Sequence, residues 1–425
     1  MQGSYPRVRL PGWLSLPPDF GPRHRRVLGL VALGSMLVAF TNTLFTQTVA
    51  YAADEFGVSN SAQGLGSAIV RWGIVISLPI VALADSRGRR PMIVATAWAA
   101  PFVCALGAFA PTFPALVATQ TVGRPLGLTL DILLAVIIVE EMPHDSRAWA
   151  TAMLAVVSGF GAGVAVASLP LADVSETSWR WIYLLSLMWL PFAWIITRGL
   201  PESARFVARK HDFVGHLRHA AVGGLTRNLG RICAVVFLTN IFVATMSIFQ
   251  NRYLKETRGF SAAMVAVFTM ATSSPAALGL VAGGRIADAR GRRRIGAVMV
   301  PLGSVLLALS FALSGVPMWT VAVFGALLLG FAYPALAVYR GELFPTHQRG
   351  LAGGLIMASS LIGGSIGLIG AGRAVDSGAT YGDVMLLLAV FPLLASLVVW
   401  WRYPETAHRT LEELNPEDAP AQPMT

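Results

Sequence analysis

The stretch Asp85-Ser86-Arg87-Gly88-Arg89-Arg90 decides how this chain is organised, because a second copy follows as Asp288-Ala289-Arg290-Gly291-Arg292-Arg293. The two aspartates are 203 residues apart (288 − 85). Each copy comes directly after a long apolar segment. A pattern of one acid and several arginines, met twice in the same apolar context, indicates an internal repeat.

Two further motifs keep nearly the same spacing. Glu140-x-x-Pro143-x-x-x-Arg147 returns at an offset of 202 as Glu342-x-x-Pro345-x-x-x-Arg349. Pro201-Glu202-Ser203 returns at an offset of 203 as Pro404-Glu405-Thr406. A nearly constant offset in three separate motifs predicts a tandem duplication of about half the chain. Two similar apolar halves are typical of a transporter that moves one half against the other.

The composition indicates a membrane protein. Of the 425 residues, 55% are hydrophobic and only 13% are charged, which is unlike an ordinary soluble domain. Apolar runs of about 18 residues or more, the length needed to cross a bilayer, recur along the chain. We predict twelve spans, six in each repeat: 27–50, 62–84, 91–110, 113–139, 148–172, 180–199, 230–251, 261–286, 295–314, 317–340, 350–372 and 384–401.

The arginines predict the orientation and the domain limits. They gather in every second connection and in both terminal segments, so the positive-inside rule places both termini in the cytoplasm. We expect a multi-pass protein of the cell membrane. Its predicted parts are an N-terminal tail (1–26), a six-helix bundle (27–200), a cytoplasmic linker (201–229), a second six-helix bundle (230–403) and a C-terminal tail (404–425).

Several classes of function are excluded by what the sequence lacks. Cys104 and Cys233 both fall inside predicted spans, so we expect no disulfide and no metal cluster. No phosphate-binding loop, metal-ligand set or nucleophile–base pair stands out, which argues against an enzyme and against ATP-driven transport. We therefore predict no catalytic residue, no metal and no cofactor. The net charge of +10 follows membrane topology, so we expect no nucleic-acid partner.

The duplicated loop makes the chain similar to the major facilitator superfamily of transporters. Gly284-Arg285-Ile286-Ala287-Asp288-Ala289-Arg290-Gly291-Arg292-Arg293 is close to that family's Gly-x-x-x-Asp-x-x-Gly-Arg-Arg loop. The first copy has Val81 in place of the usual glycine and Ser86 where a basic residue is common. The resemblance covers about residues 27–413. It implies an all-α membrane fold of twelve helices in two pseudo-symmetric six-helix halves, which works by alternating access.

A narrower likeness is to the sugar-porter and metabolite–proton symporter branches. It rests on the two repeats above and on Pro201-Glu202-Ser203-Ala204-Arg205-Phe206, in which Ala204 replaces a usual second proline. The glycine–proline antiporter signature is absent from 158–168. We interpret the spaced charges as a cytoplasmic gate, with simple positive-inside topology as the alternative. The gate residues are Asp85, Arg89, Glu140, Arg147, Glu202, Arg205, Asp288, Arg292, Glu342, Arg349 and Glu405.

Three charged residues lie deep in predicted spans: Arg71, Arg124 and Asp131. Charges there are costly, so such residues normally face a cavity or a partner. Arg124 and Asp131 are seven residues apart, which puts both on one face of a helix, about 10 Å from each other. We hypothesise that Arg124 holds a substrate anion or Asp131 by turns and that Asp131 titrates. A permanent Arg124–Asp131 ion pair is the alternative. For Arg71, a structural or snorkelling role competes with a cavity-facing one.

The family resemblance implies that helices one, four, seven and ten surround a central cavity. The predicted substrate and proton site is therefore formed by Asn42, Thr46, Arg71, Arg124, Asp131, Asn240 and Tyr333.

The sequence predicts a monomeric secondary transporter for a small organic solute, coupled to protons by symport, with a slight preference for an organic anion or carboxylate. A proton-coupled exporter of drugs or metabolites is the alternative. A non-transporting nutrient sensor is a further one, although the tail after Pro404 is short for signalling. The lipid bilayer, the solute and protons are the expected partners.

Overall fold

In the computed structural model the chain is a bundle of α-helices, and the described residues are 20–143, 147–201, 227–344, 349–407 and 413. These residues contain no β-strand. Eleven of their helical segments are long and apolar enough to cross a membrane. The segment α12 (Arg292–Leu309) takes the remaining place, although three arginines occupy its first turn. The predicted twelve-helix architecture in two halves is confirmed.

The first half contains six spans, several of them broken by short 3₁₀ segments. Within the described residues they run α1 (Pro22–Glu55); α2 (Asn60–Trp72), η1 (Gly73–Ile76) and α3 (Ser77–Arg87); α4 (Arg89–Ala105) and η2 (Leu106–Phe109); α5 (Phe113–Glu141); α6 (Arg147–Ala167) and η4 (Leu169–Asp173); and α7 (Trp179–Leu184), η5 (Leu185–Trp189) and α8 (Leu190–Gly199).

The second half repeats this plan. Its spans are α10 (Arg227–Glu256); α11 (Ala262–Arg290); α12 (Arg292–Leu309); α13 (Gly315–Ala337) with the short α14 (Tyr339–Glu342); α15 (Arg349–Asp376); and α16 (Tyr381–Leu388) with α17 (Val390–Arg402). The predicted linker (201–229) and C-terminal tail (404–425) lie mostly outside the described residues, as does the N-terminal tail up to residue 19.

The duplication seen in the motifs extends to backbone conformation. Gly88 and Gly291, 203 residues apart, both have positive φ angles, of 103° and 99°, where one span turns into the next. A side chain is disfavoured at such angles, which explains the glycine in both loop motifs. At the other end, Ser59 caps α2 and Ser261 caps α11, each by accepting a hydrogen bond from the N–H three residues on.

Small residues set how closely the helices approach. A Cβ added at Gly161 in α6 would overlap the backbone carbonyl of Met36 in α1, whereas one added at Gly163 would meet nothing within 4 Å. Gly64 in α2 lies in the same way against the backbone of Leu368 in α15, across the two halves. Because apolar burial gives little drive inside lipid, close backbone packing of this kind holds the spans together.

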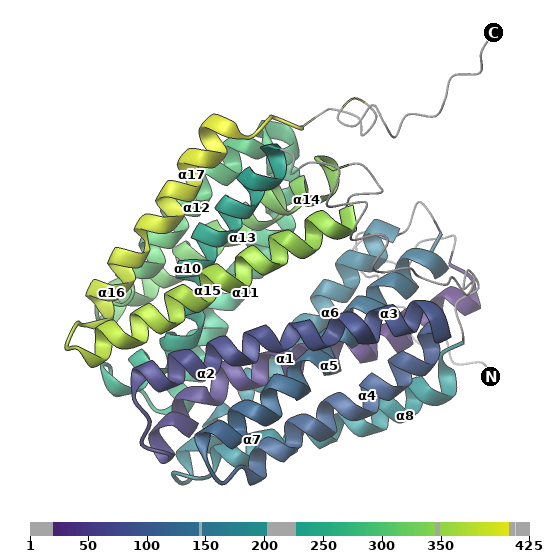
Figure 1. The fold of residues 1–425 in the computed structure, drawn as a ribbon, viewed down its shortest axis with the longest axis horizontal. Coiled ribbons are helices and arrows are strands. Elements are labelled where there is room, and N and C mark those ends of the chain that lie inside the picture. The colour runs from purple at the N-terminus through teal and green to yellow at the C-terminus, as the bar shows by residue number, and fades with distance from the viewer. Residues whose placement is uncertain (1–19, 144–146, 202–226, 345–348, 408–412, 414–425) are drawn as a thin grey trace, which may run out of the picture.

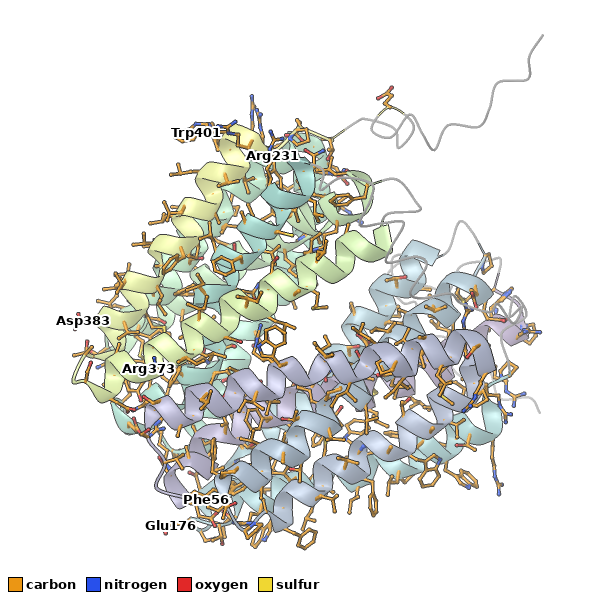
Figure 2. The ribbon with its side chains drawn as sticks, in the orientation of Figure 1. Phe56, Glu176, Arg231, Arg373, Asp383 and Trp401 are labelled. Carbon is orange, nitrogen blue, oxygen red and sulfur yellow. The ribbon has the colours of Figure 1, made fainter. Side chains whose placement is uncertain are left out.

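The two halves are joined at one end of the molecule. Figure 1 shows them meeting at the end where α2 and α16 begin and diverging toward the end where α1 begins and α17 ends. Figure 2 labels Glu176 and Asp383 at the joined end, and Arg231 and Trp401 at the other. We call the first the closed end and the second the terminal end.

The close approach of α6 to α1 gives a stability prediction. Gly161→Ala should lower the melting temperature of the purified protein, because the methyl group pushes on the Met36 backbone, an overpacking that typically costs about 1–3 kcal/mol. Gly163→Ala, two residues away in open space, is the matched control and should leave the melting temperature unchanged or slightly raised. Equal melting temperatures for both variants would contradict this packing.

Candidate functional site

Arg71 connects the two halves at mid-depth. Its Nη2 donates a hydrogen bond of 3.3 Å to Oδ1 of Asn240, which lies in α10 of the second half. A Cβ at Gly364 in α15 would lie 3.1 Å from the same Nη2, so glycine leaves room for the guanidinium. The side chain therefore reaches the second half and contacts Asn240.

Arg124 lies close to Arg71 because α2 and α5 pack closely there. A Cβ at Gly73 would overlap the carbonyl of Thr121, and Pro125 also touches this glycine. The Nε atoms of both arginines are buried and have no hydrogen-bond partner. Each arginine therefore keeps one unsatisfied donor inside the helix bundle.

Two further residues of the predicted site lie in α1 and α5: Asn42 belongs to α1, and Asp131 belongs to α5, the helix of Arg124. Oδ1 of Asn42 in α1 is buried without a hydrogen-bond partner, and a Cβ at Gly127 in α5 would lie 3.5 Å from it. Asp131 has an exposed side chain seven residues after Arg124. Among the described residues, no ion pair joins Asp131 to Arg124. The permanent ion pair between these two residues is thus not the arrangement of this conformation.

Asn240 and Tyr333 line one cavity of about 310 Å³ in the second half. It lies between α10 and α13, and Arg340 lines it toward the terminal end. Since Arg71 bonds Asn240, this cavity borders the arginine pair. Two of the predicted site residues on the second half therefore share a cavity, and the remaining lining is mainly aliphatic.

A second cavity, of about 290 Å³, lies nearer the closed end. Thr46 of the predicted site lines it, and Leu329 lines both cavities. Its other polar groups were not predicted from the sequence, because isolated serines, threonines and amides in apolar helices resemble packing residues. They carry hydroxyl or amide groups and no charge: Gln47, Ser247, Gln250, Asn251, Thr269, Thr272, Ser273 and Ser310.

The closed end is held by two equivalent carboxylate contacts. Asp173, which ends the fifth span, accepts hydrogen bonds of 2.6 and 2.8 Å from the N–H groups of Ala262 and Ala263 at the start of α11. Asp376, which ends the eleventh span, accepts bonds of 3.0 and 2.8 Å from the N–H groups of Asn60 and Ser61 at the start of α2. Each aspartate thus satisfies the first free N–H groups of a helix in the opposite half.

These two contacts, which we call the carboxylate caps, obey the sequence repeat. Asp173 and Asp376 are 203 residues apart, and their partners Ala262 and Asn60 are 202 apart. The repeat could have revealed the pair, but neither aspartate belongs to a conspicuous motif. Further contacts between the halves surround the caps: Lys255 with Asp54, Asn251 with Gln47, Arg252 with Gln63, and Tyr381 with Asn60.

At the terminal end, the predicted gate residues of the second half form one cluster. Arg292 donates to Asp288 at 2.9 Å and to Glu342 at 2.5 Å. Glu405 accepts hydrogen bonds from the N–H groups of Arg292 and Arg293, so it caps α12. The cluster joins the turn between α11 and α12, the end of α14 and the segment after α17, all in the second half.

The first half contains the counterpart pair Arg89 and Glu140, which form an ion pair. Glu202 and Arg205 lie outside the described residues, and the same holds for the side chains of Asp85, Arg147 and Arg349. Of the predicted gate, the contacts around Arg292 and the pair Arg89–Glu140 are described.

A fold of two related six-helix halves, with duplicated acidic–basic loops, places the chain among membrane transporters. The sequence matches the model of the Major Facilitator Superfamily over residues 31–300 and 232–425. The chain belongs to this family and is a multi-pass membrane protein. No curated protein matches the sequence.

Solved structures have the same fold at low identity. The inward-open xylose transporter XylE from E. coli is 17% identical, with a TM-score of 0.74 over 92% of this chain and 99% of that one. The nucleoside transporter NupG is 14% identical, with a TM-score of 0.72 over 88% and 98%. An occupied, inward-facing bacterial homologue of the human lysosomal transporter Spinster is 15% identical, with a TM-score of 0.68 over 94% and 99%.

The carboxylate caps give a prediction about closure. Asp173→Asn and Asp376→Asn together should let the halves separate at the closed end, because hydrogen bonds to a charged group are worth about 1.5–3 kcal/mol. Spin labels at Phe109→Cys and Val316→Cys, exposed near that end in opposite halves, should report a population at longer distance in a background lacking Cys104 and Cys233.

The matched control is Asp383→Asn. Asp383 is an exposed carboxylate at the same end, and it bonds only within its own half, to Thr380, among the described residues. Its distance distribution should equal that of the wild type. An unchanged distribution in the double cap variant would show that the carboxylates do not hold this end closed.

Proposed function

We propose that the protein is a proton-coupled secondary transporter that moves a small organic solute across the cytoplasmic membrane by alternating access, with both termini in the cytoplasm. One observation supports an anionic solute above others: Arg71 and Arg124 lie on segments that pack against each other, and each has a buried, unpartnered Nε atom beside the interface of the two halves. A carboxylate would accept hydrogen bonds from both and offset their repulsion.

The position of the arginine pair suits alternating access. Arg71 belongs to the first half and bonds Asn240 of the second, so a solute bound there touches both halves. The carboxylate caps close the path on one side of this level. With the termini in the cytoplasm, the closed end faces outward and the solute site opens inward. A solute that bridges the halves stabilises whichever state brings its partners together.

A neutral polyol such as a sugar is the second candidate solute. The uncharged hydroxyl and amide lining of the 290 Å³ cavity supports it, because such groups match the hydroxyls of a sugar. Two solved structures of the same fold carry the titles of a xylose transporter and of a D-xylose–proton symporter. A drug exporter is weakly supported in comparison, because two unpaired arginines repel lipophilic cations.

Solute class can be tested by thermal stabilisation of the purified protein with carboxylates, sugars, nucleosides and lipophilic cations at two pH values. We expect carboxylates to give the largest shift. Arg71→Gln or Arg124→Gln should weaken that binding about 10- to 100-fold, the loss expected for about 1.5–3 kcal/mol of charge-assisted bonding.

Arg373→Gln is the control for this panel, because Arg373 is an exposed arginine at the closed end, away from both cavities. It should bind carboxylates like the wild type. A shift from sugars alone, insensitive to the arginine variants, would replace the anion by a polyol. A shift from lipophilic cations alone would favour the exporter.

Proton coupling is assigned to Asp131, the acidic residue two turns from Arg124 on the same face of α5. Asp131→Asn should abolish uphill accumulation in proteoliposomes with a pH gradient while leaving solute exchange largely intact, because exchange needs no net proton movement. Normal accumulation by Asp131→Asn would remove this residue from the proton path.

A further inference from the structure

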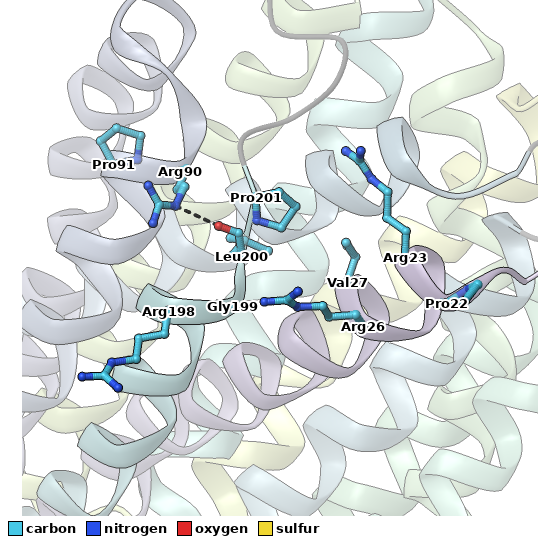
Figure 3. A pocket seen from close by; sticks show the side chains of 10 residues that line it. All are labelled: Pro22, Arg23, Arg26, Val27, Arg90, Pro91, Arg198, Gly199, Leu200 and Pro201. Carbon is cyan, nitrogen blue, oxygen red and sulfur yellow. Dashed lines mark hydrogen bonds between the residues drawn. The ribbon is translucent and has the colours of Figure 1, made fainter.

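A cavity of about 620 Å³ lies at the terminal end of the first half, away from the solute site. It is formed where α1 and α4 begin and α8 ends. Four arginines line it. In Figure 3, Arg26 and Arg90 are directed toward the chain at 199–201, whereas the Arg198 guanidinium points away from them. The residues used below are Arg23, Arg26, Arg90, Arg198, Val27 and Leu200; we call the cavity the basic pocket.

The charge of the basic pocket is only partly compensated. Arg23 pairs with Glu141 at 3.0 Å. Arg90 donates to the carbonyl oxygens of Leu200 and Thr197, at 2.8 and 3.0 Å, which orients the guanidinium. No acidic residue is among those that line the pocket in the described part of the chain, and Arg26 and Arg198 form no ion pair there. The pocket therefore attracts an anion.

Exposed tryptophans place the basic pocket at the edge of the membrane. Trp194 lies one turn before Arg198, whose Cζ is 4.1 Å from the indole ring. Trp98 donates from Nε1 to Thr197 at 3.0 Å. The two rings are 47% and 39% exposed. Tryptophans with an exposed ring and a polar contact are enriched at the level of lipid headgroups.

We propose that the basic pocket binds the headgroup phosphate of an anionic membrane lipid. Guanidinium groups bind phosphate through paired, charge-assisted hydrogen bonds. The apolar side chains of Val27 and Leu200 and the neighbouring tryptophans suit the start of an acyl chain, which a free phosphate lacks. With the termini in the cytoplasm, the pocket faces the leaflet that carries anionic lipid. The bound lipid links the ends of α1, α4 and α8.

The second half supplies a matched comparison. At the offset of 203 residues, Arg26 corresponds to Leu229 and Arg198 to Trp401, so the repeat lacks two of the arginines. Arg402, the last residue of α17, is nevertheless an exposed arginine at the same end. It controls for any general effect of removing positive charge from this surface.

The test is native mass spectrometry and thermal stabilisation of the detergent-purified full chain with phosphatidylglycerol, cardiolipin or phosphatidylcholine. The wild type should retain phosphatidylglycerol and cardiolipin and gain thermal stability from them. Arg26→Gln with Arg198→Gln should weaken this binding about 25-fold, since an arginine near a lipid surface contributes about fivefold. Arg402→Gln should bind like the wild type.

Three results would overturn the lipid site. Equal stabilisation by phosphatidylcholine would remove the requirement for net anionic charge. Equal stabilisation by inorganic phosphate or glycerol phosphate, without acyl chains, would assign the pocket to a free phosphate. An equal loss of binding in Arg402→Gln and in the double variant would show a diffuse surface effect. Each readout is independent of the transported solute.

Discussion

The closed end depends on one constraint: a helix that begins at the interface of two halves has N–H groups without partners in its own first turn. Here α2 and α11 begin where the halves meet, and Asp376 and Asp173 satisfy those groups from the opposite half. Both carboxylates bond the backbone N–H groups of a helix start, and Asp376 also accepts a hydrogen bond from the side chain of Asn60. These contacts close one end while leaving the halves free to separate, since water can replace the carboxylate when they part.

Contact between the halves at the closed end also determines the surroundings of Arg71. Within the first half, Gly73 lets its segment pack closely on α5. With the halves held together, Gly364 of α15 leaves room for the Arg71 guanidinium, which bonds Asn240. Two like charges in a region of low dielectric are tolerated only with an opposing charge or with water. Separation of the halves at the closed end would break the Arg71–Asn240 bond and move Arg71 away from the second half.

The repeated motifs and apolar runs predicted the architecture. The bilayer fixes how long a span must be, and the constant offset of three motifs indicates a duplicated half. The cost of burying charge marked Arg71 and Arg124, and the family resemblance added Asn240; their role in a solute site stays a prediction. Sequence reasoning missed the carboxylate caps and the polar cavity lining. In the sequence, Asp173 and Asp376 resemble ordinary loop residues. Only the packing of the two halves brings each of them to the start of a helix. Serines and threonines such as Thr269 bond their own helices as readily as a solute, so sequence could not assign them.

The duplication is preserved in the loops and caps at the two ends of the molecule and is lost at the predicted solute-site residues. The loop glycines, the serine caps and the carboxylate caps all occur twice. By contrast, at an offset of 202, Arg71 aligns with Ser273, Arg124 with Ala326 and Asp131 with Tyr333. Closure requires matching surfaces on both halves, so selection for closure retains symmetry. A single solute has no such symmetry, and one half is free to supply charge while the other supplies hydroxyls, amides and an aromatic ring. The positions where the repeat breaks are therefore the ones that the proposed solute site uses.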